Sequence, residues 1–215
     1  MRKTSCFILL LLGGMAANAQ TNASHKASPT SFGIKGGINF ADYFRYQFPS
    51  GTKPGMDWSV SFHSGITLNA PLKKKLSLQT ELLYTGAGSK SIFDSASPGP
   101  IRYEQRFHYL SLPLVLQHRT THFLIETGPV PAYLVKARQI GPGGVRTDNK
   151  NSFHKFDLSW AVGIGYVYKN CLGFGIRYNY GLTSVLPKKN RLGLPINARQ
   201  QNSVVQIGLS FTSKK

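Results

Sequence analysis

Acidic residues are scarce in this 215-residue chain, which has 8 Asp plus Glu against 26 Lys plus Arg and a formal net charge of +18. Charge of either sign is also sparse, because charged residues make up 16% of the chain, against roughly 25% in soluble globular domains. This low density argues against an ordinary soluble surface, while 41% hydrophobic residues exclude an intrinsically disordered chain. The basic excess indicates an anionic partner, such as nucleic acid, lipid phosphate or an acidic glycan.

Long apolar runs are missing as well, and one short run lies near the N-terminus. Arg2 and Lys3 precede the apolar residues 6–12, and an Ala-Asn-Ala site follows at 17–19. The run is too short to cross a bilayer as a helix, and this order is typical of a secretory signal peptide. We therefore expect residues 1–19 to be a signal peptide, residues 20–30 a flexible leader and residues 31–215 the folded domain.

Cysteine is almost absent, since the chain has 2 cysteines and Cys6 leaves with the signal peptide. Cys171 then stands alone, so an intramolecular disulfide is excluded even in an oxidising compartment. No histidine or acid adjoins Cys171 in sequence, and we expect no reactive role for it.

Amphipathic helical patterns are lacking after the signal, and apolar residues instead alternate with small or polar residues in eight segments. The segments span about nine to thirteen residues each, the length of a tilted strand that crosses hydrocarbon. Their apolar positions fall within 32–40, 58–68, 76–84, 110–116, 123–135, 156–168, 172–180 and 205–211. The connections alternate between long (42–57, 86–105, 136–152, 183–201) and short (70–75, 118–121, 169–171). This rhythm predicts an all-β, eight-stranded antiparallel up-and-down transmembrane β-barrel, with long loops outside and short turns in the periplasm.

A soluble lipocalin-like barrel has the same alternation with its apolar face turned inward. Three features favour the membrane. Glycines are frequent at the polar positions of the alternation, as a narrow eight-stranded lumen requires, and examples are Gly163, Gly165, Gly173 and Gly175. Aromatic residues gather near strand ends, where interfacial girdles lie. The polar parity also carries too few charges to form the outer face of a soluble barrel.

Three prolines interrupt the pattern, since Pro113, Pro129 and Pro131 fall inside the fourth and fifth predicted strands. Proline cannot donate to a strand ladder, so we expect a bulge or a break there.

Several blocks of sequence resemble successive strands of the PorT-type outer-membrane β-barrel family. They read SFGIKGGINFA, LSLQTELLYTGAGSK, YLSLPLVLQ, FLIETGPVPAYL, FDLSWAVGIGYVY and LGFGIRYNYGLTSV. The resemblance covers about residues 31–212 and implies an eight-stranded barrel in the cell outer membrane of a Gram-negative bacterium. The name-giving member is linked to type IX secretion, so a role as an accessory component of a secretion system is an alternative function. Gln206, Gly208 and Phe211 look like the terminal signal read by the barrel-assembly machinery, although residues 212–215 follow where an aromatic end is usual.

Charged residues occupy five of the strand positions that face the lumen, and we expect them to form a lumen charge network. Four of them lie at similar depth, with Arg177 bridging towards Glu126 and Glu81. One interpretation is a proton or ion path or an acid/base pair. We favour a structural plug of paired charges, because an unpaired buried charge is costly. The five residues are Lys35, Glu81, Glu126, Asp157 and Arg177.

Catalytic and metal-binding patterns are not recognisable. His118 and His122 flank a predicted turn, but no third ligand accompanies them at metal spacing. We therefore predict a non-enzymatic, monomeric barrel with no catalytic residues, metal or cofactor. An outer-membrane lipid-modifying enzyme is the less favoured alternative.

The basic excess gathers in predicted loops and turns. We expect two loops to bind outer-membrane lipid, lipopolysaccharide phosphates or another anionic surface ligand. The alternative is generic attraction to anionic head groups at both membrane faces. Nucleic acid is not an expected partner, because the signal removes the chain from it. The residues concerned are Lys136, Arg138, Arg146, Lys150, Lys188, Lys189, Arg191 and Arg199.

Overall fold

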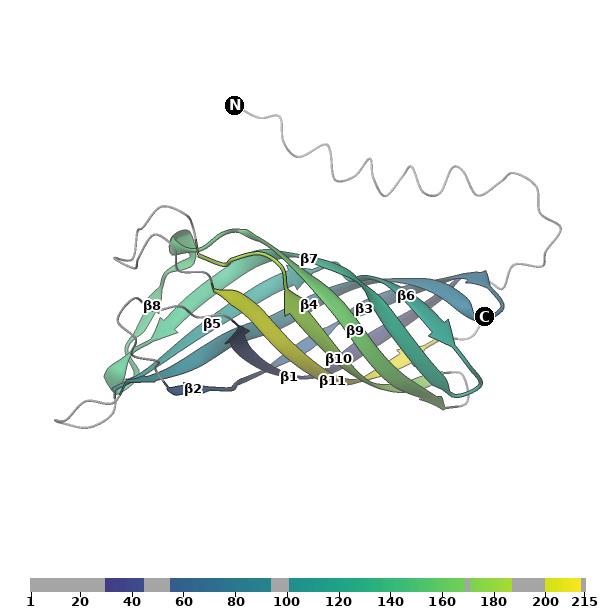
Figure 1. Ribbon diagram of the computed structural model, residues 1–215, viewed down its shortest axis with the longest axis horizontal. Coiled ribbons are helices and arrows are strands. Elements are labelled where there is room, and N and C mark those ends of the chain that lie inside the picture. The colour runs from purple at the N-terminus through teal and green to yellow at the C-terminus, as the bar shows by residue number, and fades with distance from the viewer. Residues whose placement is uncertain (1–29, 45–54, 94–100, 169–170, 187–199, 214–215) are drawn as a thin grey trace, which may run out of the picture.

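The described part of the computed structural model covers residues 30–44, 55–93, 101–168, 171–186 and 200–213, and it forms a closed antiparallel β-barrel (Figure 1). Eight strand positions follow one another around the barrel in chain order, which confirms the predicted fold class. The sixth to eighth are β9, β10 and β11, and β11 closes the barrel by pairing with β1.

The principal strands are β1 (Ser31–Phe44), β3 (Ser59–Lys73), β4 (Leu76–Phe93), β5 (Ile101–Ser111), β6 (Leu114–Arg119), β7 (Phe123–Ile140), β9 (Phe156–Tyr168), β10 (Leu172–Gly181) and β11 (Gln201–Thr212). Minor elements are β2 (Gly55–Asp57), β8 (Arg146–Asp148) and the 3₁₀ turns η1 (Pro142–Gly144) and η2 (Lys150–Ser152).

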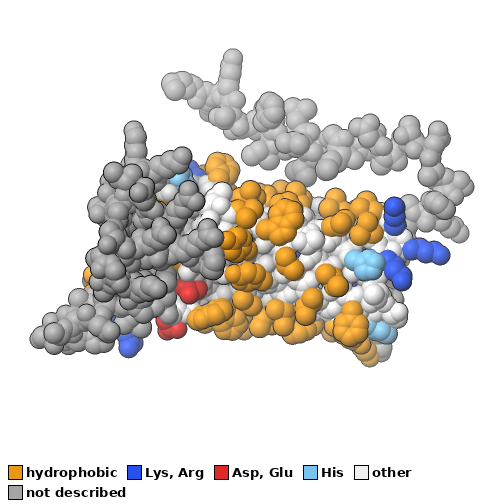
Figure 2. Space-filling view, viewed as in Figure 1, with side chains coloured by type: hydrophobic (Ala, Val, Ile, Leu, Met, Phe, Trp, Pro, Cys, Tyr) orange, Lys and Arg blue, Asp and Glu red, His pale blue; other side chains and the backbone are white. Residues whose placement is uncertain are grey.

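Side chains alternate between the outside and the lumen. On β1, Ile34 and Ile38 are 61% and 51% exposed, while Asn39 is fully buried. Figure 2 shows apolar side chains across the middle of the visible face of the barrel, with several basic side chains beyond them at the right-hand end. An exposed apolar belt of this extent suits a lipid environment and not water. The apolar residues of each strand therefore face outward, as the glycines at the alternate, polar positions predicted.

The two ends of the barrel differ. The short β3–β4 and β6–β7 connections lie at the same end as Thr30 and Ser213, the first and last described residues (Figure 1). Because short turns face the periplasm in outer-membrane barrels, we name this the periplasmic end and the opposite one the extracellular end. Among the described residues, no helix is long or apolar enough to span a bilayer.

Two of the predicted long loops are in large part strand. β4 and β5 pair as far as Phe93 and Ile101, so most of the predicted loop 86–105 belongs to a hairpin. Likewise β7 runs to Ile140 and pairs with the short strand β8 inside the predicted loop 136–152. These extensions lie beyond the apolar belt, where ladder hydrogen bonds continue without the apolar alternation that marks a strand in the sequence. Most of the predicted loops 42–57 and 183–201 lies outside the described residues.

The prolines produce a break without an inserted residue. Residues 112–113 separate β5 from β6, yet Leu83↔Ser111 and Thr80↔Leu114 keep one register. The backbone N–H of Leu112 still donates to the carbonyl of Pro131 at 2.8 Å. Pro129 and Pro131 remain inside β7 and paired with β9. The bulge lies a few residues further along β7, where the register with β5 shifts by one after Leu134.

The extracellular half of the lumen contains an apolar cluster, contrary to the expectation of a uniformly small and polar interior. Phe107 and Leu134 are fully buried there, and the Phe107 ring packs edge-on against Phe153 with centroids 4.8 Å apart. The cluster joins β1, β4, β5, β7 and β11 across the interior, on the extracellular side of the polar lumen. We call it the apolar plug, and its members are Ala41, Tyr43, Ala87, Phe107, Tyr109, Leu134, Ala137, Val185 and Val204.

Candidate functional site

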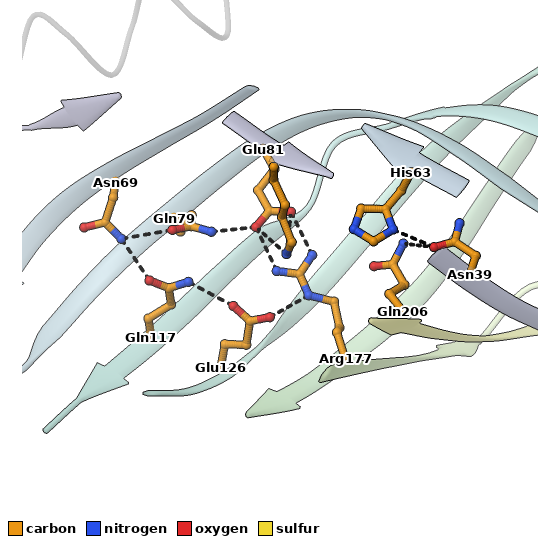
Figure 3. A network of polar contacts seen from close by, with 10 residues as sticks. Asn39, His63, Asn69, Gln79, Glu81, Gln117, Glu126, Arg177 and Gln206 are labelled. Atoms are coloured by element: carbon orange, nitrogen blue, oxygen red, sulfur yellow. Dashed lines mark hydrogen bonds and ion pairs between the residues drawn. The ribbon is translucent and has the colours of Figure 1, made fainter. Parts of the chain in front are cut away.

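Arg177 is the centre of a buried ion-pair network in the polar half of the lumen (Figure 3). Its Nη1 and Nη2 donate to Oε2 and Oε1 of Glu81 at 2.8 Å each, and its Nε donates to Oε1 of Glu126 at 2.6 Å. Two parallel bonds to one carboxylate form the strong bidentate geometry of arginine. β10, which carries Arg177, lies on the opposite wall from β4, so this pair ties the two walls together.

Glycine allows Glu126 and Arg177 to meet across an intervening strand. Both residues pair in register with Gly163 of β9, which separates β7 from β10. A Cβ at Gly163 would lie 2.9 Å from Glu126 Oε1. A side chain there would occupy the space through which the two charges touch, so this glycine is required by the network.

Lys35 and three amides complete the network. Lys35 Nζ lies 3.2 Å from Glu81 Oε1, and Gln79 donates to the same oxygen at 2.6 Å. Gln117 donates to Glu126 Oε2 at 2.9 Å, and Asn69 donates to Gln117 at 2.9 Å. The sequence reasoning named the charges and missed the amides, although each lies on the inward parity of its strand.

A second polar cluster, missed by the sequence reasoning, lies beside the network and contains His63 (Figure 3). Asn39 donates its amide hydrogens to the carbonyls of Phe62 and Gly86, so its Oδ1 accepts from His63 Nδ1 at 2.6 Å. A Cβ at Gly37 would lie 2.8 Å from the His63 ring. In the sequence, His63 is a lone histidine at an inward position, and its partner on β1 is Gly37. A glycine opposite an inward histidine was the signal that could have identified this cluster.

Asp157 does not join the network, which corrects the expectation of one five-residue set. Its carboxylate accepts from Thr183 at 2.6 Å and from Asn202 at 2.8 Å. Asp157 lies on β9 six residues before Gly163, which corresponds to about 20 Å along a strand. The two sites are therefore at opposite ends of the barrel interior.

Two of the predicted loop residues lie on a strand and face outward. Lys136 and Arg138 belong to β7, where they pair with His108 and Arg106 of β5. The neighbouring positions Phe107 and Ala137 face the lumen and are fully buried. The four basic residues Arg106, His108, Lys136 and Arg138 therefore form an outward cluster near the extracellular end, which we call the basic rim.

Of the other predicted basic residues, Arg146 and Lys150 are described, and they lie outside the four-residue basic rim. Arg146 is exposed on β8, and Lys150 Nζ lies 5.7 Å from the centre of the Tyr133 ring. Lys188, Lys189, Arg191 and Arg199 lie outside the described residues, as does the predicted signal peptide 1–19.

Within the described ranges, no group of three or more His, Cys, Asp or Glu side chains is placed to hold a metal ion. His118 ends up on β6, whereas His122 in the following turn stacks on Tyr166 with ring centroids 5.6 Å apart.

Comparison with known proteins places this architecture among outer-membrane barrels. A family model described as outer membrane protein beta-barrel domain matches residues 18–186. No curated protein matches the chain. Among solved structures, the chain is similar to the attachment invasion locus protein Ail of Yersinia pestis in complex with the heparin analogue sucrose octasulfate, with 10% identity, a TM-score of 0.48 and coverage of 86% of this chain and 99% of Ail. Neisserial surface protein A shows 12% identity and a TM-score of 0.47, with coverage of 86% and 99%. Outer membrane protein W of E. coli shows 12% identity and a TM-score of 0.40, also with coverage of 86% and 99%.

Proposed function

Because the chain belongs to the outer membrane protein beta-barrel domain family, we propose a function for an integral outer-membrane barrel. It is a closed, non-enzymatic monomer that binds lipopolysaccharide phosphates through basic side chains near its extracellular end. Lys136 and Arg138 of the basic rim, together with Arg146 and Lys150, are the described residues in this proposal. The predicted loop residues Lys188, Lys189, Arg191 and Arg199 belong to the same proposal.

The observation that carries the proposal is a pair of like charges placed directly opposite each other. Arg106 of β5 pairs with Arg138 of β7. Two positions away on the same strands, Lys136 pairs with His108, which is uncharged at pH 7. Like charges in such cross-strand positions are destabilising without a counter-ion. Glu104 engages Arg106 through bonds of 2.8 and 3.0 Å. Asp148 of β8 pairs in register with Arg138, but the ion pairs among the described residues include neither Lys136 nor Arg138, so both side chains can take an external anion.

The position of the basic rim supports a lipid phosphate as that anion. His108 is hydrogen-bonded to Tyr84 at 2.7 Å and stacks on its ring. Tyrosines at the edge of an apolar belt lie at the level of the lipid head groups. Arginine binds phosphate in bidentate fashion, so two outward basic side chains at this level fit a phosphorylated lipid.

The test is lipid retention by protein purified from native membranes. The variant Lys136→Ser/Arg138→Ser is expected to retain several-fold less lipopolysaccharide than the wild type, measured as bound phosphate and lipid per barrel. The matched control Lys73→Ser/Lys74→Ser removes two exposed lysines at the periplasmic end and should retain as much as the wild type. Equal retention in both variants would refute specific binding and leave generic attraction to head groups.

Within the family, we propose that the chain is of PorT type, with an accessory role in protein secretion as the alternative function. The sequence blocks that resemble PorT-type strands contain the charged members of the lumen network, Lys35, Glu81, Glu126 and Arg177. Affinity purification from native membranes tests this alternative, because a secretion component should bring down periplasmic partner proteins reproducibly.

Two further parts of the proposal have direct assays. Lipase and acyltransferase assays on the purified protein test the non-enzymatic assignment, and turnover of lipid substrates would support the lipid-modifying alternative. Phe211 lies on β11, the strand that closes the barrel against β1. Slower assembly of a Phe211→Ser variant would support recognition of this strand by the barrel-assembly machinery.

A further inference from the structure

The periplasmic half of the lumen contains a polar cavity of about 250 Å³. Thr30, Arg119 and Ser213 line it near the periplasmic end, and Lys35 and Arg177 line its inner end. The volume corresponds to about eight water molecules and lies just below the roughly 300 Å³ at which ligand pockets begin. We call this cavity the vestibule, and its size suits a small polar molecule.

The vestibule is closed towards the outside of the cell. Beyond Arg177 there is a smaller void of about 40 Å³, lined by residues that include Leu83 and Tyr109. The apolar plug follows, with Phe107 and Leu134 fully buried. A solute therefore reaches the vestibule from the periplasm.

The vestibule wall includes four glycines, Gly165, Gly173, Gly175 and Gly208, and Gly175 is not required there by packing. A Cβ at Gly175 would lie 3.4 Å from the carbonyl oxygen of Ile164 and 4.0 Å from the Cα of Gly165, which are ordinary contacts. Glycine inside a strand is destabilising, and it often marks a place where a ligand approaches the backbone closely. The absence of a side chain at Gly175 thus preserves space that a larger residue would fill.

The charges facing the vestibule favour an anion. Its charged lining residues are Lys35, Arg119 and Arg177 against Glu126. Both oxygens of Glu126 already accept bonds, from Arg177 and from Gln117. Even with Glu81 counted behind Lys35, the positive charges exceed the negative charges by one.

Lys35 has hydrogen-bonding capacity that the network does not use. Both contacts of its Nζ within the described structure go to the single carboxylate of Glu81, at 3.2 and 3.4 Å. An ammonium group has three donors, and the Lys35 side chain is 14% exposed at the vestibule. At least one N–H is therefore available to a bound acceptor.

We propose that the vestibule is a binding site for a small organic anion, carrying a carboxylate or phosphate group that accepts from Lys35. The occupant enters from the periplasm. The site lies at the opposite end of the barrel from the basic rim, so its occupation is independent of lipopolysaccharide binding.

The test uses the full mature barrel in detergent micelles, titrated at constant ionic strength with succinate and, separately, with glycerol phosphate. Backbone amide shifts of Gly173, Gly175 and Gly208 report on the wall, and calorimetry reports the affinity. We expect saturable binding of at least one probe, and the preferred probe identifies the anionic group. Gly175→Leu, which fills the space, and Lys35→Met, which removes the donor, should each weaken binding about tenfold or more.

Matched variants control for the added and the removed side chain. Gly36→Leu places the same side chain on the outer wall, where a Cβ meets its nearest atom at 3.6 Å. Lys73→Met removes an exposed lysine from β3. Both controls should bind as the wild type does. Because Gly175→Leu leaves the ion pairs in place, it remains informative if Lys35→Met fails to fold. Absence of binding of both probes, or equal binding by Gly175→Leu and the wild type, would overturn the proposal.

Discussion

Arg177 on β10 and Glu81 on β4 join opposite walls of the barrel through two N–H···O bonds of 2.8 Å each. The residues are 96 positions apart in the chain, and their side chains are 2% and 0% exposed. A buried pair of this kind is costly to break, because the remaining partner becomes an uncompensated buried charge.

Replacement of Arg177 should therefore destabilise the barrel strongly. For Arg177→Ala we expect a loss of about 3–5 kcal/mol in the free energy of unfolding, measured by thermal and urea denaturation in detergent. Arg106→Ala is the control, since it breaks the exposed Arg106–Glu104 pair and should cost at most about 1 kcal/mol. Unchanged thermal stability of Arg177→Ala would refute a structural role for the network.

Gly163 should tolerate no side chain. Gly163→Val places a Cβ 2.9 Å from Glu126 Oε1 and 3.1 Å from the carbonyl of Ile176, so it should separate Glu126 from Arg177. We expect a large fall in thermal stability, whereas Gly175→Ala, whose Cβ has room, should cost little. Equal stability of the two variants would contradict the spacing role of Gly163.

The lumen should not conduct ions. The bidentate Arg177 pair and the apolar plug stand in series along the barrel axis, and ions do not cross a packed apolar layer readily. Purified protein in planar bilayers should give no unitary conductance steps above the lipid baseline. Reproducible steps that persist after repurification would show that the plug opens, and they would favour a narrow channel.

Closure of the barrel should depend on the β1–β11 seam. Gly37 pairs with Gly208 there, and a Cβ on Gly37 would collide with the backbone of Ile207 and Gly208. Wild-type protein should migrate faster on a gel before boiling than after it, and Gly37→Val should lose this difference. Gly36→Val, one residue away and facing outward, serves as the control and should keep it.

Much of the fold could be read from the sequence because the membrane imposes a simple rule on it. Residues such as Ile34 and Ile38 alternate with Lys35 and Asn39 because lipid lies on one side of the strand and a narrow lumen on the other. Beyond the apolar belt the alternation of apolar and polar residues weakens, so the sequence does not mark the strand extensions to Phe93 and Ile140. The apolar plug was missed because its residues lie on the inward parity, where the sequence reasoning expected small and polar side chains.

The sequence by itself determined that eight strands alternate, that their apolar side faces lipid, and that charges such as Arg177 and Glu81 face inward. These properties depend on the period of a strand, which is local. Only the tertiary structure decided which lumen residues meet, because closure and register set the height of each residue on the barrel wall. That is why Gly163 lets Arg177 touch Glu126, why Asp157 lies about 20 Å away along its strand, and why the periplasmic half of the lumen retains a cavity of about 250 Å³ beside Lys35.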